Sequence, residues 1–189
     1  MKAKKTLFIT LAISGSGKTW YIKNKMREDF PDLDSYLTEN NLDISELIVS
    51  PDDMRRELTG DVNNHDKDLQ IWKSLVFTRT KEKLKEHGFC IFDATSVAKR
   101  KGFLKHFKSI KKIGLVFNPD IELSWERISE DIKNGVDRSN VPLEGIEAQY
   151  DRFRNSVIYY KWDGIWNKVI KKKIKERLRK EEELEIHFC

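Results

Sequence analysis

One stretch near the start of the chain constrains the fold more than any other: an apolar run that leads directly into a glycine-rich loop. Residues 7–13, LFITLAI, are almost continuously apolar. Such a run is typical of a strand that is buried on both faces of a parallel sheet. The loop SGSGKT follows at residues 14–19, and a stretch with helical character follows the loop. This order of strand, loop and helix predicts an α/β domain.

The loop has the residue types of a phosphate-binding loop. Residues 12–19, AISGSGKT, match the pattern G-x-x-x-x-G-K-[ST], with Ala12 in place of the first glycine. Backbone N–H groups can ring a phosphate only where the loop is tight and its side chains are small. The residues expected to form the nucleotide site are Gly15, Ser16, Gly17, Lys18 and Thr19.

The last two residues of the pattern have separate expected roles. The loop leads into a helix N-terminus, whose free N–H groups and dipole favour anions. Lys18 can reach the β- and γ-phosphates of a nucleotide, and the Thr19 hydroxyl can ligate Mg²⁺. The alternative is a small-residue turn without a ligand. The spacing of Gly-Lys-Thr behind an apolar strand favours the nucleotide site.

Two acids follow the second expected strand, which covers residues 47–49. Pro51 suits the first turn of the next helix. Ligands of a doubly wound sheet bind beyond the carboxyl ends of its strands, where Asp52 can accept a proton from an attacking substrate hydroxyl. Arg55, one helical turn later, can hold a substrate phosphate. The alternative is that Asp52 and Asp53 only supply the negative charge that is favoured at a helix start.

A third expected strand also ends in an acid. Residues 89–92, FCIF, lead into Asp93, which stands where phosphate-loop proteins carry an acid that holds Mg²⁺ through water or orients a neighbouring group. The alternative is that Asp93 caps the helix expected over residues 97–107, a task that Thr95 or Ser96 can also perform.

The segment before this strand predicts a long helix over residues 66–87, which Gly88 ends. Its less polar residues recur at helical spacing, so we expect one face of the helix to lie in the core. The residues on this face are Leu69, Trp72, Leu75, Val76, Thr80 and Leu84.

A polar loop that carries an arginine joins two later helices. The loop covers residues 134–142 and contains Arg138, and the helix before it carries Arg127. Phosphotransferases of this architecture place a lid here, which closes over the phosphates, excludes water and offers guanidinium groups. The alternative is an ordinary connection in which Arg138 pairs with Asp137 or Glu144.

Length and charge fit one domain with a basic surface. The 189 residues contain no repeat and no linker, so we expect residues 1–170 to form one domain and residues 171–189 to form a charged helical tail. The net charge of +5 favours a polyanionic partner, although a solvated surface of mixed Lys and Glu explains much of it. A basic cluster that can flank a nucleic-acid groove, or equally can solvate a surface helix, contains Lys99, Arg100, Lys101, Lys105, His106, Lys108, Lys111 and Lys112.

The cysteines and the hydropathy predict the compartment. Cys90 lies in an apolar run and Cys189 is the last residue, so the chain has no disulfide framework and suits a reducing compartment. No stretch approaches the length of a membrane helix, and residues 7–13 are too short for a signal peptide. We expect a cytoplasmic protein with no membrane partner.

Taken together, these segments resemble the kinase domain of bacteriophage polynucleotide 5′-hydroxyl kinases, within the P-loop kinase superfamily. The resemblance covers residues 7–169 and rests on AISGSGKT, VSPDDMRREL, IFDATSVAKRK, LVFNPDIELSWERI and VDRSNVP. The discriminating features are the Asp-Asp-x-x-Arg after the second strand, the acid after the third strand and the Arg-x-x-Val-Pro of the lid. They imply a 5′-hydroxyl end of DNA or RNA as substrate and ATP with Mg²⁺ as cofactors.

The resemblance also implies residue roles. Asp52 would be the general base toward the 5′-hydroxyl, Arg55 would bind the phosphate beside the acceptor nucleoside, and Asp93 would help to organise the acceptor site. Arg127 and Arg138 would supply positive charge from the lid. The implied biology is repair of broken nucleic-acid ends, in the host cytoplasm if the chain is phage-encoded. No D-x-D-x-[TV] phosphatase signature occurs, so 3′-phosphatase activity is not expected.

The predicted architecture is a P-loop kinase fold: a parallel sheet of about five strands with helices on both faces and a helical lid. The predicted activity is transfer of the γ-phosphoryl group of ATP to a 5′-hydroxyl of DNA or RNA. Two alternatives stay open. One is a kinase that acts on another hydroxyl, in a hydroxymethylated DNA base, a nucleoside or a small metabolite. The other is a nucleotide-binding regulatory module without kinase activity.

Overall fold

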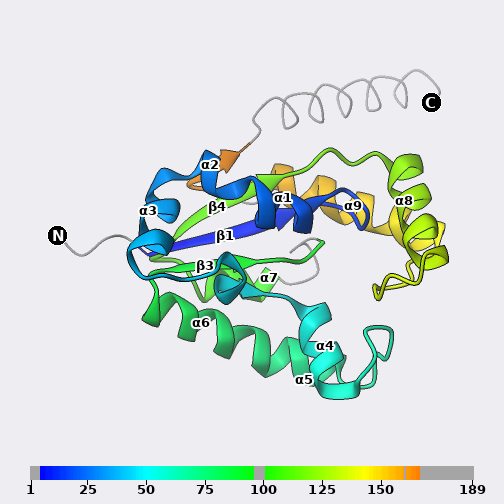
Figure 1. Ribbon diagram of the computed structural model, residues 1–189, viewed down its shortest axis with the longest axis horizontal. Coiled ribbons are helices and arrows are strands. Elements are labelled where there is room, and N and C mark those ends of the chain that lie inside the picture. The colour runs from blue at the N-terminus through cyan, green and yellow to red at the C-terminus, as the bar shows by residue number, and fades with distance from the viewer. Residues whose placement is uncertain (1–4, 96–100, 160, 167–189) are drawn as a thin grey trace, which may run out of the picture.

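The protein is built around one five-stranded parallel sheet, shown by a computed structural model that describes residues 5–95, 101–159 and 161–166 (Figure 1). The strand order is β2-β3-β1-β4-β5, and every neighbouring pair is parallel. The strands are β1 (Thr6–Leu11), β2 (Ile48–Val49), β3 (Phe89–Phe92), β4 (Lys111–Val116) and β5 (Gly164–Trp166). The predicted fold class is therefore confirmed.

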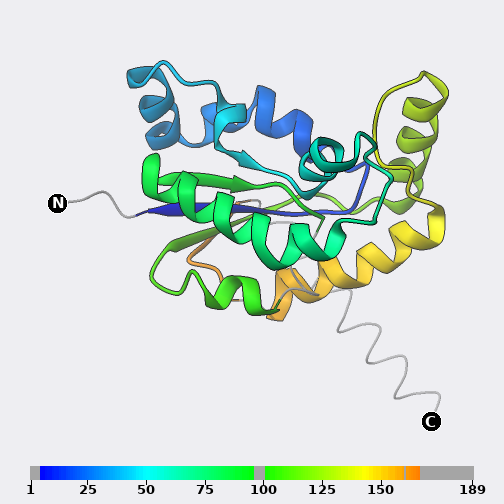
Figure 2. The same cartoon turned by 90° about the horizontal axis from the view of Figure 1, so that it is seen from below.

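Helices cover both faces of the sheet (Figures 1 and 2). One face carries α1 (Lys18–Asn24), α2 (Met26–Asp29), α3 (Pro31–Glu39) and the 3-10 turn η1 (Ile44–Leu47). The other face carries α6 (Val76–Glu86), α7 (Lys101–Lys105) and α9 (Leu143–Tyr159). The remaining helical segments are α4 (Pro51–Thr59), α5 (Asp68–Gln70), the π turn η2 (Ile71–Leu75) and α8 (Ile121–Lys133).

Strand β1 is buried on both faces, which explains its nearly continuous apolar sequence. Successive side chains of a strand point to opposite faces. Leu7 and Ile9 accordingly belong to the core under α6, α7 and α9, and Phe8 belongs to the core under α1, α2 and α3. A parallel sheet of this kind is stable only when helices cover both of its faces.

The strand order brings three functional segments together at the carboxyl edge of the sheet. Because β1 lies between β3 and β4, the segment after β3 must lie beside the phosphate loop after β1. Backbone hydrogen bonds tie these ends together: Ala12 N donates to Thr95 O at 2.9 Å, and Asp93 N donates to Val49 O at 3.0 Å. The second bond also joins the end of β3 to the end of β2, just before Asp52.

The prediction that residues 66–87 form one regular helix with a single buried face is wrong. The helix begins at Asp68 and contains the π turn η2 before α6. A π turn adds one residue to a turn and rotates the preceding helix relative to the following one. Val76, Thr80 and Leu84, which follow the π turn, are buried as predicted, and Trp72 and Leu75 pack partly buried against the core. Leu69 precedes the turn and is 66 % exposed, so it is not a core residue.

Other predictions fall partly outside the described residues. Of the helix predicted over residues 97–107, the structure describes residues 101–107, in which α7 ends at Lys105 and turns follow; Ser96, Lys99 and Arg100 lie outside the described residues. The tail at residues 171–189 also lies outside the described part, and the division at residue 170 stays a prediction. Within residues 5–95, 101–159 and 161–166, no helix has the length and apolar character that crossing a membrane requires.

Candidate active site

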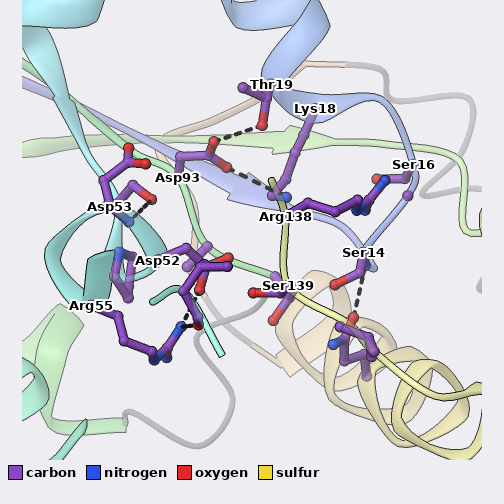
Figure 3. A pocket seen from close by; sticks show the side chains of 18 of the residues that line it. Ser14, Ser16, Lys18, Thr19, Asp52, Asp53, Arg55, Asp93, Arg138 and Ser139 are labelled. Atoms are coloured by element: carbon purple, nitrogen blue, oxygen red, sulfur yellow. Dashed lines mark hydrogen bonds and ion pairs between the residues drawn. The ribbon is translucent and has the colours of Figure 1, made fainter. Parts of the chain in front are cut away.

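A cavity of about 1350 Å³ opens at the carboxyl edge of the sheet. Its walls come from the phosphate loop, α4, the segment after β3, α8, α9 and the loop at residues 134–142. All of the candidate site residues predicted from the sequence line this cavity, and Figure 3 shows several of them converging. They are Gly15, Ser16, Gly17, Lys18, Thr19, Asp52, Arg55, Asp93, Arg127 and Arg138.

The phosphate loop has the backbone that its glycines permit. Gly15 and Gly17 have φ angles of 78° and 83°, in the left-handed region that other residues rarely adopt. Ala12, in the place of the first glycine, is fully buried and is not among the residues with positive φ, so alanine fits there. Ser14 N donates to Gln149 Oε1 on α9 at 2.7 Å, which anchors the loop to this helix.

We expect Gly15→Ala to weaken ATP binding by about tenfold or more. A left-handed backbone costs alanine roughly 1–2 kcal/mol, and each 1.4 kcal/mol is tenfold in affinity. An added Cβ would also lie 2.3 Å from the backbone oxygen of Ser124 on α8, so the loop or the helix must move. Titration with ATP, followed by tryptophan fluorescence, measures the effect.

Gly88→Ala is the matched control for backbone strain. Gly88 has a φ of 76° and no atom within 4 Å of its added Cβ, and it lies at the opposite edge of the sheet. This variant should lose some stability and keep the affinity for ATP. Equal ATP affinity in the Gly15 variant and the wild type would show that the loop does not need this glycine.

Asp93 makes its contacts with the phosphate loop. Its carboxylate accepts a hydrogen bond from Thr19 Oγ1 at 3.1 Å, and Lys18 Nζ lies 3.9 Å from its other oxygen. Thr10 Oγ1 lies 3.4 Å from the same carboxylate, which is only 8 % exposed. These contacts favour a role in the site for Asp93. A hydroxyl beside a carboxylate fits Mg²⁺, which prefers oxygen ligands and takes few of them from the protein.

The second acid of the site is held by a buried arginine. Pro51 opens α4 and Ser50 caps it by accepting from Asp53 N at 3.2 Å, so Asp52 lies in the first turn. Arg55 Nη1 donates to Asp52 Oδ1 at 2.7 Å, and the Asp52 side chain is 55 % exposed at the cavity. A carboxylate that is both fixed in place and open to the cavity can act on a bound ligand.

Arg55 is itself fixed by further partners. Its side chain is 6 % exposed, and its Nε donates to Asp68 Oδ1 at 2.9 Å while Nη1 also donates to Val62 O at 3.2 Å. Burial by itself lowers the pKa of Arg55, but the hydrogen bonds and charges of Asp68 and Asp52 outweigh burial and raise the pKa above its ordinary value. Arg55 therefore stays charged and orients Asp52. No described residue accepts a hydrogen bond from its Nη2.

The loop at residues 134–142 reaches across to α4 and to the segment that follows it. Arg56 donates from Nε to Asp137 Oδ2 at 2.7 Å and from Nη1 to Asp53 Oδ1 at 2.9 Å. Asn140 N donates to Asn63 Oδ1 at 2.7 Å. The loop therefore lines the cavity and is tied to α4, which supports its expected role as a lid.

The two predicted lid arginines lie on different elements. Arg127 is an exposed residue of α8, and its Nη1 lies 3.4 Å from Gly15 O in the phosphate loop. Arg138 is in the loop and pairs with Asp131 of α8, and with neither Asp137 nor Glu144. The Arg138 Nε is buried and has no hydrogen-bond partner among the described residues.

Sequence reasoning missed several residues that line the cavity. They are Asp68, Arg56, Gln149 and Arg152. Asp68 accepts a hydrogen bond from Arg55, and Arg56 donates one to Asp137 in the lid loop. Gln149 and Arg152 are one helical turn apart on a helix that follows the lid, and nothing in their spacing distinguishes them from solvated residues.

Two other features of the sequence that could have a chemical role, the described part of the basic cluster and Cys90, are not part of the cavity. Of the basic cluster, the described members Lys105, His106, Lys108, Lys111 and Lys112 do not line the cavity, and Lys111 and Lys112 begin β4 at the opposite edge of the sheet. Lys112 Nζ donates to Ile110 O at 2.9 Å, so it supports the local structure. Cys90 is fully buried, and burial raises the pKa of its thiol to about 12, so it is not a nucleophile at neutral pH.

Comparison with known proteins places this site in a family. Among curated proteins, no significant match to the sequence is found. Among solved structures, the fold is similar to "Shikimate kinase from Acinetobacter baumannii in complex with shikimate", with a TM-score of 0.45 and 12 % identity over 94 % of this chain and 93 % of that chain. A family model described as an AAA domain matches residues 7–156, which is most of the chain and includes the predicted site residues. The chain therefore belongs to this family of AAA domains.

Proposed function

We propose that the protein transfers the γ-phosphoryl group of ATP to a hydroxyl group, and that the acceptor is the 5′-hydroxyl of DNA or RNA. One observation carries the first part of the proposal. The fixed carboxylate of Asp52 and the phosphate-binding residues Lys18 and Thr19 line the same cavity. A phosphate site together with a positioned base is what phosphoryl transfer to a hydroxyl needs.

Asp52 is the general base of the proposed reaction. The acceptor oxygen attacks the γ-phosphorus while its proton passes to the Asp52 carboxylate, and the bond from the γ-phosphorus to the β,γ-bridging oxygen breaks to release ADP. Arg55 holds Asp52 through a 2.7 Å hydrogen bond, and Asp68 holds Arg55 through one of 2.9 Å. This chain of contacts fixes the direction of the base, and a fixed orientation of a catalytic group lowers the barrier.

Positive charge would stabilise the transferring group. Lys18, Arg127 and Arg138 line the cavity from the phosphate loop, α8 and the lid loop. Removal of water by the lid strengthens these electrostatic interactions and protects ATP from hydrolysis. Thr19 and Asp93 would hold Mg²⁺, which, when bound, neutralises charge on the phosphates.

The size of the cavity supports a second substrate beside ATP. Ligand pockets for one small molecule measure roughly 300–1000 Å³, and the cavity measures about 1350 Å³. The net charge of +5 suits a polyanionic acceptor, and the resemblance to polynucleotide 5′-hydroxyl kinases favours a nucleic-acid end. A hydroxymethylated base, a nucleoside and a small metabolite are the competing acceptors.

A comparison of acceptors tests the proposal. The protein is incubated with γ-labelled ATP and Mg²⁺ beside 5′-hydroxyl DNA and RNA oligonucleotides, duplexes with hydroxymethylated bases, and free nucleosides. We expect label on the 5′-hydroxyl ends. Label confined to modified bases or nucleosides would overturn the acceptor but keep the kinase. Phosphate release without a labelled acceptor would favour a nucleotide-dependent regulatory module instead.

A further inference from the structure

We propose that Arg152 binds an anionic group of the acceptor, a phosphate or a carboxylate close to the reacting hydroxyl. The proposal deepens the function proposed above and rests on it. No sequence motif identifies Arg152, because it lies in the middle of α9, beyond the lid loop. What identifies it is its place in the charge balance of the cavity.

Each acidic residue that lines the cavity forms an ion pair with a cation other than Arg152. Arg55 pairs with Asp52 and Asp68, and Arg56 pairs with Asp53 and Asp137. Arg138 pairs with Asp131, and Lys18 lies 3.9 Å from Asp93. Among the described residues that line the cavity, the cations that form no ion pair are Lys23, Arg127 and Arg152.

Arg152 differs from the other two of these cations in its exposure. Lys23 and Arg127 are exposed, so water solvates their charges, whereas Arg152 is half-buried. Arg127 also donates to Gly15 O in the phosphate loop. A half-buried arginine that has no carboxylate partner among the described residues leaves its charge uncompensated in the free protein. The charge is compensated when an anion enters the cavity and pairs with it.

The backbone of Arg152 is held firmly beside the phosphate loop. One turn earlier on α9, Gln149 accepts from Ser14 N at 2.7 Å. The next residue, Phe153, is completely buried in the core under the sheet. These contacts fix α9 against the site, so that little ordering is needed when Arg152 binds its ligand. A planar guanidinium with several donors suits phosphate and carboxylate groups.

The same cavity limits what Arg55 can do for such an anion. Its Nε and Nη1 are already engaged by Asp68, Asp52 and Val62, which leaves Nη2 alone without a described partner. Arg55 can therefore contribute one donor at most without breaking its hold on Asp52. The bidentate contact that a phosphate prefers must come from another residue. Arg152 is suited to this contact, since it lines the cavity, is half-buried and forms no ion pair with a described residue.

The test compares two acceptors that differ by one phosphate. Steady-state kinetics are measured with a nucleoside 3′-monophosphate and with the same nucleoside, for the wild type and Arg152→Gln. We expect the variant to raise KM for the phosphorylated acceptor by about 10- to 100-fold, the range for a lost hydrogen bond to a charged group. KM for the plain nucleoside and KM for ATP should stay unchanged. Arg152→Lys should recover part of the loss because it keeps the charge.

A neighbouring arginine is the matched control. Arg154 lies on the same helix, stacks over the Tyr150 ring at 5.8 Å and is not among the residues that line the cavity. Arg154→Gln should keep the preference for the phosphorylated acceptor. An Arg152→Gln variant that raises KM for ATP instead, or that loses both acceptors equally, would overturn the proposal. Thermal melting identifies a variant that fails to fold, and Arg152→Lys then carries the comparison.

A binding measurement separates this proposal from the proposed function. If the wild type phosphorylates neither acceptor, calorimetry with ADP-saturated protein measures binding of the nucleoside 3′-monophosphate directly. Binding that weakens in Arg152→Gln would keep the anion site while the kinase function fails. Equal binding by the two proteins, or no binding by the wild type, would overturn the anion site.

Discussion

Asp52→Asn is expected to lower the rate of phosphoryl transfer by about 10²- to 10⁴-fold, the usual contribution of a general base. The amide oxygen of the substituted side chain can still accept the hydrogen bond from Arg55 Nη1, so the local geometry is retained. An amide cannot accept the proton of the attacking hydroxyl. Because Asp52 lies on α4 and not in the phosphate loop, ATP affinity should not change. Single-turnover transfer from γ-labelled ATP and equilibrium binding of ATP measure the two quantities separately.

The adjacent acid provides the control for this prediction. Asp53 also lines the cavity, but it pairs with Arg56, which in turn pairs with Asp137 in the lid loop. Asp53→Asn should therefore slow transfer far less than Asp52→Asn. Normal transfer by the Asp52 variant would show that another group accepts the proton. A loss of ATP binding equal to the loss of transfer would show that Asp52 has a structural role.

Lys18→Ala is expected to weaken ATP binding and to lower turnover by about 10²- to 10³-fold, as when one preorganised donor to a transition state is removed. Lys18 is the first residue of α1 and follows Gly17, whose left-handed backbone turns the chain at the end of the loop. Its ammonium group lies 3.9 Å from Asp93 and lines the cavity. Its removal deletes a charge that binds the phosphates in the ground state and in the transition state. Calorimetric titration with ATP, followed by the transfer assay, measures both losses.

Lys25→Ala is the matched control, because it removes the same side chain from the same face of the sheet. Lys25 is exposed, pairs with Glu28 at 2.9 Å and does not line the cavity. This variant should bind ATP and transfer its phosphate normally. Unchanged ATP affinity together with unchanged turnover in Lys18→Ala would contradict the assignment of the loop as the phosphate site, whereas a loss of turnover with unchanged affinity would restrict the role of Lys18 to the transition state.

The elements that the sequence predicted well are those whose signals are local. The apolar run at residues 7–13 predicted a strand buried on both faces because both faces of β1 need apolar side chains. Pro51 predicted the start of α4 because its ring fixes the backbone angle that a first turn requires. Gly88 predicted the end of α6 because a helix commonly ends at a residue with a left-handed backbone, which glycine adopts easily, and its φ is 76°.

The errors arose where a contact or a phase depends on distant residues. Leu69 is exposed because the π turn after it changes the rotation of the helix, and no residue type announces such a turn. The ion pair of Arg138 with Asp131 of α8 also differs from the two partners that the alternative to a lid named, Asp137 and Glu144.

The sequence by itself determined the phosphate loop, the individual buried strands and the identity of the candidate site residues, because each of these depends on residues that are covalently close. Only the tertiary structure decided how these residues work together. The strand order β2-β3-β1-β4-β5 places Asp93 beside Thr19. The fold turns Arg55 toward Asp52 and Asp68, and it places Arg152 at the cavity with no ion-pair partner among the described residues. Pairing and desolvation depend on which side chains meet across the sheet edge, and that is a property of the assembled fold.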